Sequence, residues 1–188
     1  MPADGLALPY TPDSPEGLAA RWVRWVADAG PVSNPVEDET GQYAGQNQPD
    51  DVWFLAGTYG RKPVERRCLV PIGRELFLPV FNLWDVGSGG PPPVVERAFG
   101  SLTLDGVTVE PVEIGTPIPF TVAGARLNGV TGRKSPFPVT VWGLWSHLPA
   151  LEPGEHDLHA VGGDGEGFVV DVRYRLSVVA TAGNYSLW

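Results

Sequence analysis

The sequence predicts a mainly β protein, an antiparallel β-sandwich of the immunoglobulin-like or jelly-roll type, with one amphipathic helix near the N-terminus. Short apolar runs bounded by Gly and Pro, such as residues 52–56 and 76–81, are typical of buried strands. Residues 168–179 alternate apolar and polar side chains, the pattern of a strand with one face on the core and one in water. Helices do not alternate with strands, which argues against an α/β fold.

The expected helix spans residues 15–29. Asp13 or Ser14 can cap its N-terminus, and Pro15 suits the first turn. Its apolar stripe repeats at helical spacing and comprises Leu18, Trp22, Trp25, Val26 and Ala29. We expect Trp22 and Trp25 to pack this helix onto a sheet rather than to form an exposed stacking platform for a ligand.

The expected strands span residues 52–56, 67–70, 75–81, 101–104, 107–112, 118–122, 139–147, 156–161 and 168–179. Asp105 and Gly106 stand between two of them, a strong hairpin signal. In the last strand Tyr174 should face the core and Arg173 the solvent. Residues 13–188 should form a single sandwich domain, preceded by an extended Pro-rich arm over residues 1–12.

Composition excludes several classes of function. The formal net charge of −9 argues against binding to nucleic acid and to anionic membranes. No apolar run approaches the length of a membrane span. The lone Cys68 rules out an intramolecular disulfide and is expected to be a buried, inert thiol. The N-terminus as given resembles no signal peptide, which predicts a cytoplasmic protein, or a secreted one if the natural N-terminus is longer.

Two charged regions leave alternatives open. Residues 31–51 are rich in Asp and Glu, which suits calcium, but their spacing matches no calcium loop and a solvated acidic loop is the favoured interpretation. Glu65, Arg66 and Arg67 precede one strand, and Arg74 and Glu75 precede another. Their arginines are suited either to an anionic ligand or to making a sheet edge soluble.

Four sequence blocks resemble a group of uncharacterised bacterial and archaeal proteins. The blocks are WFLAGT after Val52, CLVPIGR from Cys68, FLPV ending at Val80, and LEPGEH ending at His156. The resemblance implies the same fold across most of the chain and transfers no catalytic residue. Many members of the group are exported. The last block also resembles the end of bacterial immunoglobulin-like modules, where the Pro-Gly makes a turn and the His is structural.

The candidate ligand site is the segment 82–97, which we expect to be a long irregular loop because residues 87–93 read GSGGPPP. Long loops on a rigid scaffold often carry binding residues. Trp84, flanked by Asn82 and Asp85, is the aromatic side chain that strand periodicity explains least. It contacts a ligand in one interpretation and plugs the end of the sandwich in the other.

The three histidines are the remaining candidates. His147 ends one strand, and His156 and His159 fall within another, on opposite faces. Glu155, Asp157 and His159 share a face and make a weak metal or acid–base constellation. The favoured interpretation is that His156 has a structural hydrogen bond and His159 is exposed. We therefore expect neither a metal nor a cofactor. The candidate ligand-binding residues are Asn82, Trp84, Asp85, His147 and His156.

Three functions remain open. The leading hypothesis is a non-catalytic β-sandwich module that binds a small ligand or a protein partner through the 82–97 loop. The second is an enzyme that acts on a small organic molecule in a sandwich or barrel cavity, with Asp85, His147 or His156 as acid–base groups. The third is a structural subunit that self-assembles through its N-terminal arm and exposed strands. The sequence contains no recognised catalytic motif, and it does not decide whether the protein is an enzyme.

Overall fold

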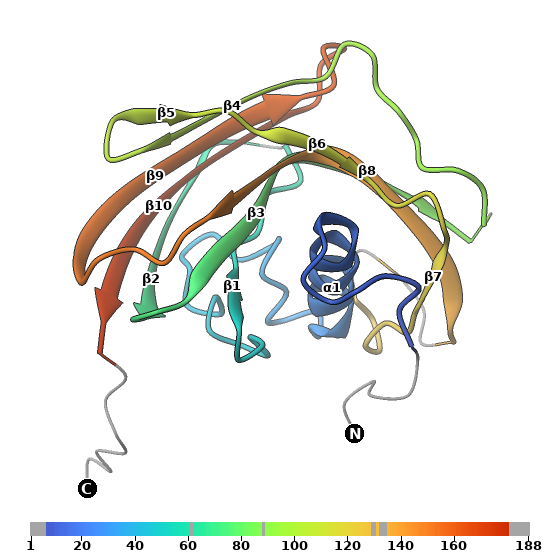
Figure 1. The fold of residues 1–188 in the computed structure, drawn as a ribbon, viewed down its shortest axis with the longest axis horizontal. Helices are drawn as coiled ribbons and strands as arrows, with labels where there is room; N and C mark the ends of the chain where they lie inside the picture. Colours follow the sequence, from blue (N-terminus) through green and yellow to red (C-terminus); the bar gives the residue numbers. More distant parts are fainter. Residues whose placement is uncertain (1–6, 61, 88, 129–130, 132–134, 181–188) are drawn as a thin grey trace, which may run out of the picture.

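The computed structural model describes residues 7–60, 62–87, 89–128, 131 and 135–180, and it shows two stacked β-sheets with one helix on the open side of the stack (Figure 1). The predicted fold class, a mainly β sandwich with an N-terminal helix, is confirmed. The immunoglobulin-like or jelly-roll subclass and the single-domain boundary stay predictions.

The two sheets share the strands as follows. Sheet A has the order β1 (Val52–Phe54), β3 (Glu75–Val86), β8 (Phe137–Leu148) and β6 (Val112–Gly115), with β7 (Phe120–Val122) also paired to β8. Sheet B has the order β2 (Val64–Pro71), β10 (Val169–Val179), β9 (Gly154–Gly163), β4 (Phe99–Leu104) and β5 (Val107–Val109). Most neighbours are antiparallel, as predicted, but β1 with β3 and β2 with β10 are parallel. No sequence signal pointed to these two pairs.

Each predicted strand is present, with changed bounds. The predicted strand over residues 107–112 is two strands, because the chain leaves sheet B after β5 and joins sheet A as β6. The Asp105-Gly106 hairpin turn between β4 and β5 is confirmed, and both residues have the positive φ (51° and 80°) that such a turn requires. Val170, Val172, Tyr174, Leu176 and Val178 of β10 are buried, which confirms the assigned core face.

The helix α1 (Pro15–Asp28) ends one residue earlier than predicted. Ser14 caps it by accepting a hydrogen bond from the Gly17 amide at 3.0 Å. Its two tryptophans are buried and donate to backbone carbonyls, Trp22 Nε1 to Leu55 O at 2.9 Å and Trp25 Nε1 to Gln46 O at 2.8 Å. The packing role expected of Trp22 and Trp25 is confirmed.

Two apolar cores fill the stack. One lies between α1 and sheet A and includes Trp22, Trp25, Phe77 and Trp145. The other lies between the two sheets and includes Leu76, Leu78, Val80 and Tyr174. Sheet A is therefore covered on both faces, which explains why β3 and β8 read as nearly continuous apolar runs in the sequence.

A β-bulge divides β3 into two parts. Its register with β8 shifts between Pro79 and Phe81. Before the bulge the even-numbered Leu76, Leu78 and Val80 face sheet B, whereas after it the even-numbered Trp84 packs on the side of α1. Because side chains alternate along a strand, one extra residue exchanges the two faces. The bulge therefore aims the end of β3 at the helix.

The prediction that residues 82–97 form one long loop is wrong for its first part. Asn82, Trp84 and Asp85 lie on β3, which continues to Val86 with Cα partners along β8 as far as Val139. Irregular structure begins only at Gly87, whose φ is 88°. The prediction failed because the polar Asn82 and Asp85 interrupt the apolar run, although pairing with the long strand β8 satisfies their backbone groups.

Arg66 also differs from its prediction as a residue of a charged surface cluster. It is 1% exposed, so it is neither a surface charge nor an open anion site. Its guanidinium donates to the carbonyls of Val36, Ala56 and Gly57 at 3.1, 2.8 and 3.0 Å. A fourth bond reaches the carbonyl of Asp38 at 2.5 Å. Arg66 thus ties together the irregular segments on either side of β1.

The described part of the N-terminal arm packs on its own chain. The Tyr10 hydroxyl donates to Ile118 O at 2.6 Å and accepts from the Ile118 amide at 2.7 Å. Leu8 and Tyr10 also contact the core beneath α1. Residues 1–6 of the predicted arm lie outside the described residues.

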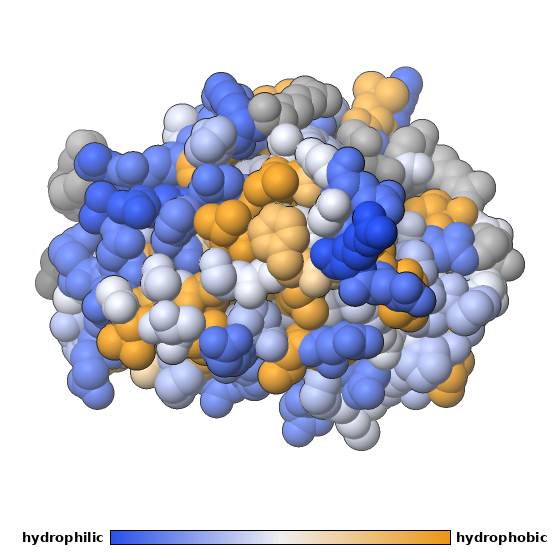
Figure 2. All heavy atoms as spheres, turned by 90° about the horizontal axis from the view of Figure 1, so that it is seen from above, coloured by the Kyte–Doolittle hydropathy of each residue, from blue (hydrophilic) through white to orange (hydrophobic). Residues whose placement is uncertain are grey.

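The face seen from above in Figure 1 carries apolar surface at its centre, bordered by hydrophilic side chains (Figure 2). The strands β4 and β6 lie at this side, and each has an exposed large apolar side chain, Phe99 and Val112. In the described part of the chain, no helix is both long and apolar enough to cross a bilayer.

Candidate functional site

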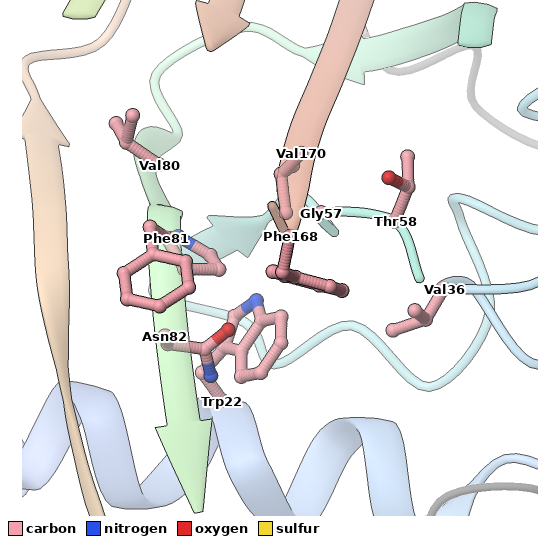
Figure 3. Close-up of a pocket in the computed structure, with 10 residues that line it drawn as sticks. Trp22, Val36, Gly57, Thr58, Val80, Phe81, Asn82, Phe168 and Val170 are labelled. Atoms are coloured by element: carbon pink, nitrogen blue, oxygen red, sulfur yellow. The ribbon is translucent and has the colours of Figure 1, made fainter. Parts of the chain in front are cut away.

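A mostly apolar hollow lies beside α1 at the far end of β3. It has a volume of about 310 Å³. The lining comes from α1, β3 and three other segments. It consists of Trp22, Val26, Val36, Thr58, Tyr59, Asn82, Leu83, Trp84, Val86 and Phe168. A smaller recess of about 40 Å³ continues beneath it, between Trp22, Asn82 and Phe168 (Figure 3).

The bulge in β3 and a close contact at Gly60 position the rings around this hollow. Trp84 meets Trp22 edge to face, with ring centroids 6.2 Å apart at 90°. Gly60 has a φ of 71°, and a Cβ there would lie 2.6 Å from a ring carbon of Phe168. Only glycine combines this backbone conformation with so close an approach. The turn that carries Tyr59 is therefore held directly against Phe168.

Asn82 supplies the unsatisfied polar group of the hollow. Its Nδ2 atom is buried, and no hydrogen-bond partner for it exists among the described residues. A buried amide without a partner costs about 1–3 kcal/mol. Figure 3 shows the Asn82 amide next to the Trp22 ring at the edge of the recess. A ligand with a hydrogen-bonding group at this position would recover the lost interaction.

A second hollow of about 420 Å³ shares Val36, Thr58 and Tyr59 with the first and is lined beyond them by charged residues. Lys62 Nζ pairs with Glu39 at 2.9 Å. Asp38 accepts hydrogen bonds from the backbone N–H groups of Thr40, Gly41 and Tyr43. Burial would raise the pKa of Asp38, but these bonds outweigh it and the pKa is lowered. Asp38 is therefore a structural carboxylate.

The structure brings together Asn82 and Trp84 of the predicted site and separates the others from them. Asp85 does not line the hollow. His147 pairs with Phe77, seven residues before Trp84 along β3, which is roughly 23 Å at the rise of a strand. His156 belongs to sheet B. Asp85, His147 and His156 do not converge on one pocket.

Each histidine is paired with a carboxylate. His147 Nε2 lies 2.8 Å from Glu75, His156 Nδ1 2.7 Å from Asp105, and His159 Nε2 2.8 Å from Asp171. His156 also contacts the Glu152 carbonyl, which agrees with the structural hydrogen bond expected for it. His159 was expected to be exposed, but its side chain is only partly exposed and pairs with Asp171.

The constellation of Glu155, Asp157 and His159 does not form a site. Asp157 pairs with Arg175 at 2.6 Å, and His159 turns to Asp171. Within the described residues, no group of three or more His, Cys, Asp or Glu side chains is placed to hold a metal ion. Cys68 is buried, as expected, and burial raises the pKa of its thiol to about 12.

Sequence reasoning missed Val36, Thr58, Tyr59 and Phe168 as site residues. Phe168 was assigned to the core face of the last strand, and it does contact that core, but it lies before β10 begins and its ring also reaches the hollow. The sequence signal for Tyr59 was its position beside Gly60. Glycine is a common residue where the backbone must approach a neighbouring group closely.

Comparisons with known proteins assign no family. No family model matches the chain, and no curated protein matches it. Among solved structures, the chain is similar to amebosin at 12% identity, over 66% of this chain and 96% of that one, with a TM-score of 0.21. A likeness this weak carries no argument about fold or function. The resemblance to the bacterial and archaeal group stays a prediction.

Proposed function

We propose that the protein is a binding module for a small, partly aromatic or aliphatic ligand, which occupies the hollow between α1, β3 and Phe168. The observation that carries the proposal is the lining itself, because four aromatic side chains surround one buried amide that has no partner among the described residues. Apolar walls with a few convergent polar groups are the usual composition of a small-molecule site.

The proposed site differs from the site predicted in the 82–97 loop, because it lies at the end of β3 and not in the irregular segment that follows. Asn82 and Trp84 remain in the site, and the bulge in β3 turns Trp84 toward α1. Residues 87 and 89–97 do not line the hollow. A protein partner is the second class of ligand expected from the sequence, and the small volume of the hollow favours a small molecule.

The alternatives have less support. An enzyme with Asp85, His147 or His156 as its acid–base group would need at least one of them at the hollow, and none of them lines it. Self-assembly through a swapped arm would need a free arm, but residues 8 and 10 pack on their own chain.

The test is a binding measurement with indole as the probe, by saturation-transfer NMR on the full chain. We expect indole to bind, and Phe168→Ala to weaken its binding at least tenfold because one wall of the hollow is removed. The control is Phe99→Ala, which removes a 44% exposed phenyl ring outside the hollow. No indole binding, or equal losses in the two variants, would contradict the proposal.

A further inference from the structure

Four aromatic rings from four separate segments meet at the hollow. Trp22 belongs to α1, Tyr59 follows β1, Trp84 ends β3 and Phe168 precedes β10. The 90° angle between Trp22 and Trp84 makes a corner rather than a stack. Trp84 is the more exposed of the two rings, because Trp22 is 2% exposed. The faces of aromatic rings carry negative potential and attract cations.

Carboxylates line the hollow that adjoins this aromatic corner. No charged side chain lines the apolar hollow within the described residues. In the adjoining hollow Glu39 is paired with Lys62, and Asp38 is engaged by backbone amides. Glu37 is exposed there and has no ion-pair partner among the residues that the structure describes. The whole chain carries a net charge of −9.

We propose that the hollow binds a small molecule with a quaternary ammonium group, an inference that rests on the proposed binding function. Trimethylammonium offers methyl groups to the rings and a positive charge that is attracted by the ring faces and, at longer range, by Glu37 in the adjoining hollow. It has no N–H to donate. A primary ammonium would bring three donors, which an aromatic lining cannot satisfy.

The other polar features fit the rest of such a molecule. The buried Nδ2 of Asn82 can donate to a hydroxyl or carboxylate oxygen carried on a short chain. The volume of about 310 Å³ lies at the lower end of the range for small-molecule sites, about 300–1,000 Å³. The size favours a free small molecule over a methylated lysine presented by a protein partner.

The experiment compares choline with 3,3-dimethylbutan-1-ol, in which carbon replaces the charged nitrogen and the shape is nearly the same. We expect choline to bind the full chain about tenfold more tightly, as measured by isothermal titration calorimetry. Raising the NaCl concentration from 50 to 500 mM should weaken choline binding and leave the binding of the neutral analogue unchanged, because salt screens the attraction to Glu37.

Two variants and a matched control locate the interaction. Trp84→Leu should weaken choline binding at least tenfold. Glu37→Gln should weaken choline binding about threefold and leave the neutral analogue unaffected. Glu110→Gln removes one exposed carboxylate outside both hollows and should change neither affinity, so it controls for the net charge of the protein.

The outcomes separate this inference from the function on which it rests. Equal affinity for choline and its neutral analogue, with indole still bound, would overturn the ammonium proposal and leave the binding module intact. Failure of all three probes to bind would overturn both. Tighter binding of a peptide-borne trimethyllysine than of choline would assign the site to a protein partner and overturn the proposal of a free small ligand.

Discussion

Arg66 Nη1 donates a hydrogen bond to the Tyr174 hydroxyl at 2.7 Å, which joins the buried cation of β2 to the core face of β10. The guanidinium carbon also lies 5.5 Å from the centre of the Tyr174 ring. The same hydroxyl donates to Ala56 O at 2.8 Å and accepts from the Ala56 amide at 3.0 Å. Arg66 and Tyr174 thus connect sheet B with the segment that carries one wall of the hollow.

Arg66→Met should lower the free energy of unfolding by about 3–5 kcal/mol, because a buried acceptor left without a donor costs about 1–3 kcal/mol and several would be left. Four carbonyl groups and the Tyr174 hydroxyl would lose their donor. Urea denaturation measures the change. The adjacent Arg67→Met alters an exposed side chain and should cost less than about 1 kcal/mol. Similar losses in the two variants would contradict the role assigned to Arg66.

Tyr174→Asp should unfold the protein, whereas Arg173→Asp should be mild. Tyr174 is 1% exposed in the core between the sheets, where an unpaired carboxylate cannot be solvated. Arg173 stands on the solvent side of β10, and its ion pair with Asp157 is long, 3.9 Å. Circular dichroism and thermal melting of the two variants give the comparison. Equal destabilisation would show that the faces of β10 are assigned wrongly.

Gly162→Ala should destabilise the sandwich at the bulge. A Cβ at Gly162 would lie 2.7 Å from the backbone oxygen of Val80 and 3.0 Å from that of Phe99, and backbone atoms in a paired sheet cannot move aside cheaply. We expect a loss of about 1–3 kcal/mol. Gly30→Ala is the control, since a Cβ there meets nothing within 4 Å. If the two variants melt at the same temperature, the sheets do not pack as closely as described.

Trp84→Ala tests whether Trp84 is a plug, a contact residue or both. Its ring packs on Trp22 and also lines the hollow. We expect a loss of stability of about 2–3 kcal/mol, because the side chain is only partly buried, and a loss of indole binding in the folded fraction. Paired thermal melts and titrations measure the two effects. Unchanged affinity would remove Trp84 from the site and leave it as a plug.

The ion pair of His156 and Asp105 makes part of the stability depend on pH. The contact with Asp105, and then the Glu152 carbonyl, raises the pKa of His156, and His156 lowers the pKa of Asp105. The histidine contributes fully below its unfolded pKa of about 6.5, and its contribution is lost as pH rises through the higher folded value. The aspartate contributes above about 3.9, and its contribution is lost as pH falls through the lower folded value.

The stabilisation by this pair is therefore largest between about pH 4 and 6.5. Melting temperatures of the wild type and His156→Gln should differ more at pH 5.5 than at pH 8.5. The effect will be small because Asp105 is half exposed. A difference that grows toward pH 8.5 would mean that the pair is not formed as described.

Local patterns were enough to predict the helix, the Asp105-Gly106 hairpin and the core face of β10. Each of these features depends on residues within a few positions of one another. The residue types and the spacing of apolar side chains are therefore enough to predict it. The parallel pairing of β2 with β10 depends on contacts between residues more than a hundred positions apart, such as Val64 with Val172. One sequence contains no signal for such a pairing.

The buried arginine had a signal that was overlooked. Arg66 stands two and four residues before Cys68 and Val70, so the period of two places it on their buried face. Its charge suggested solvent, but five hydrogen-bond acceptors in the fold satisfy it. The candidate site was only half predictable, because the bulge that turns Trp84 toward α1 is a property of the pairing with β8.

The parallel pairing of β2 with β10 also sets an order of events during synthesis. The ribosome releases Arg66 about a hundred residues before Tyr174, and until β10 emerges, β2 has no neighbour from sheet B. Nascent chains must hold β2 with an unpaired strand edge during this interval, and such an edge favours aggregation. Because β10 is the strand that joins β2 to the rest of sheet B, we expect chains stalled before Val169 to leave sheet B incomplete.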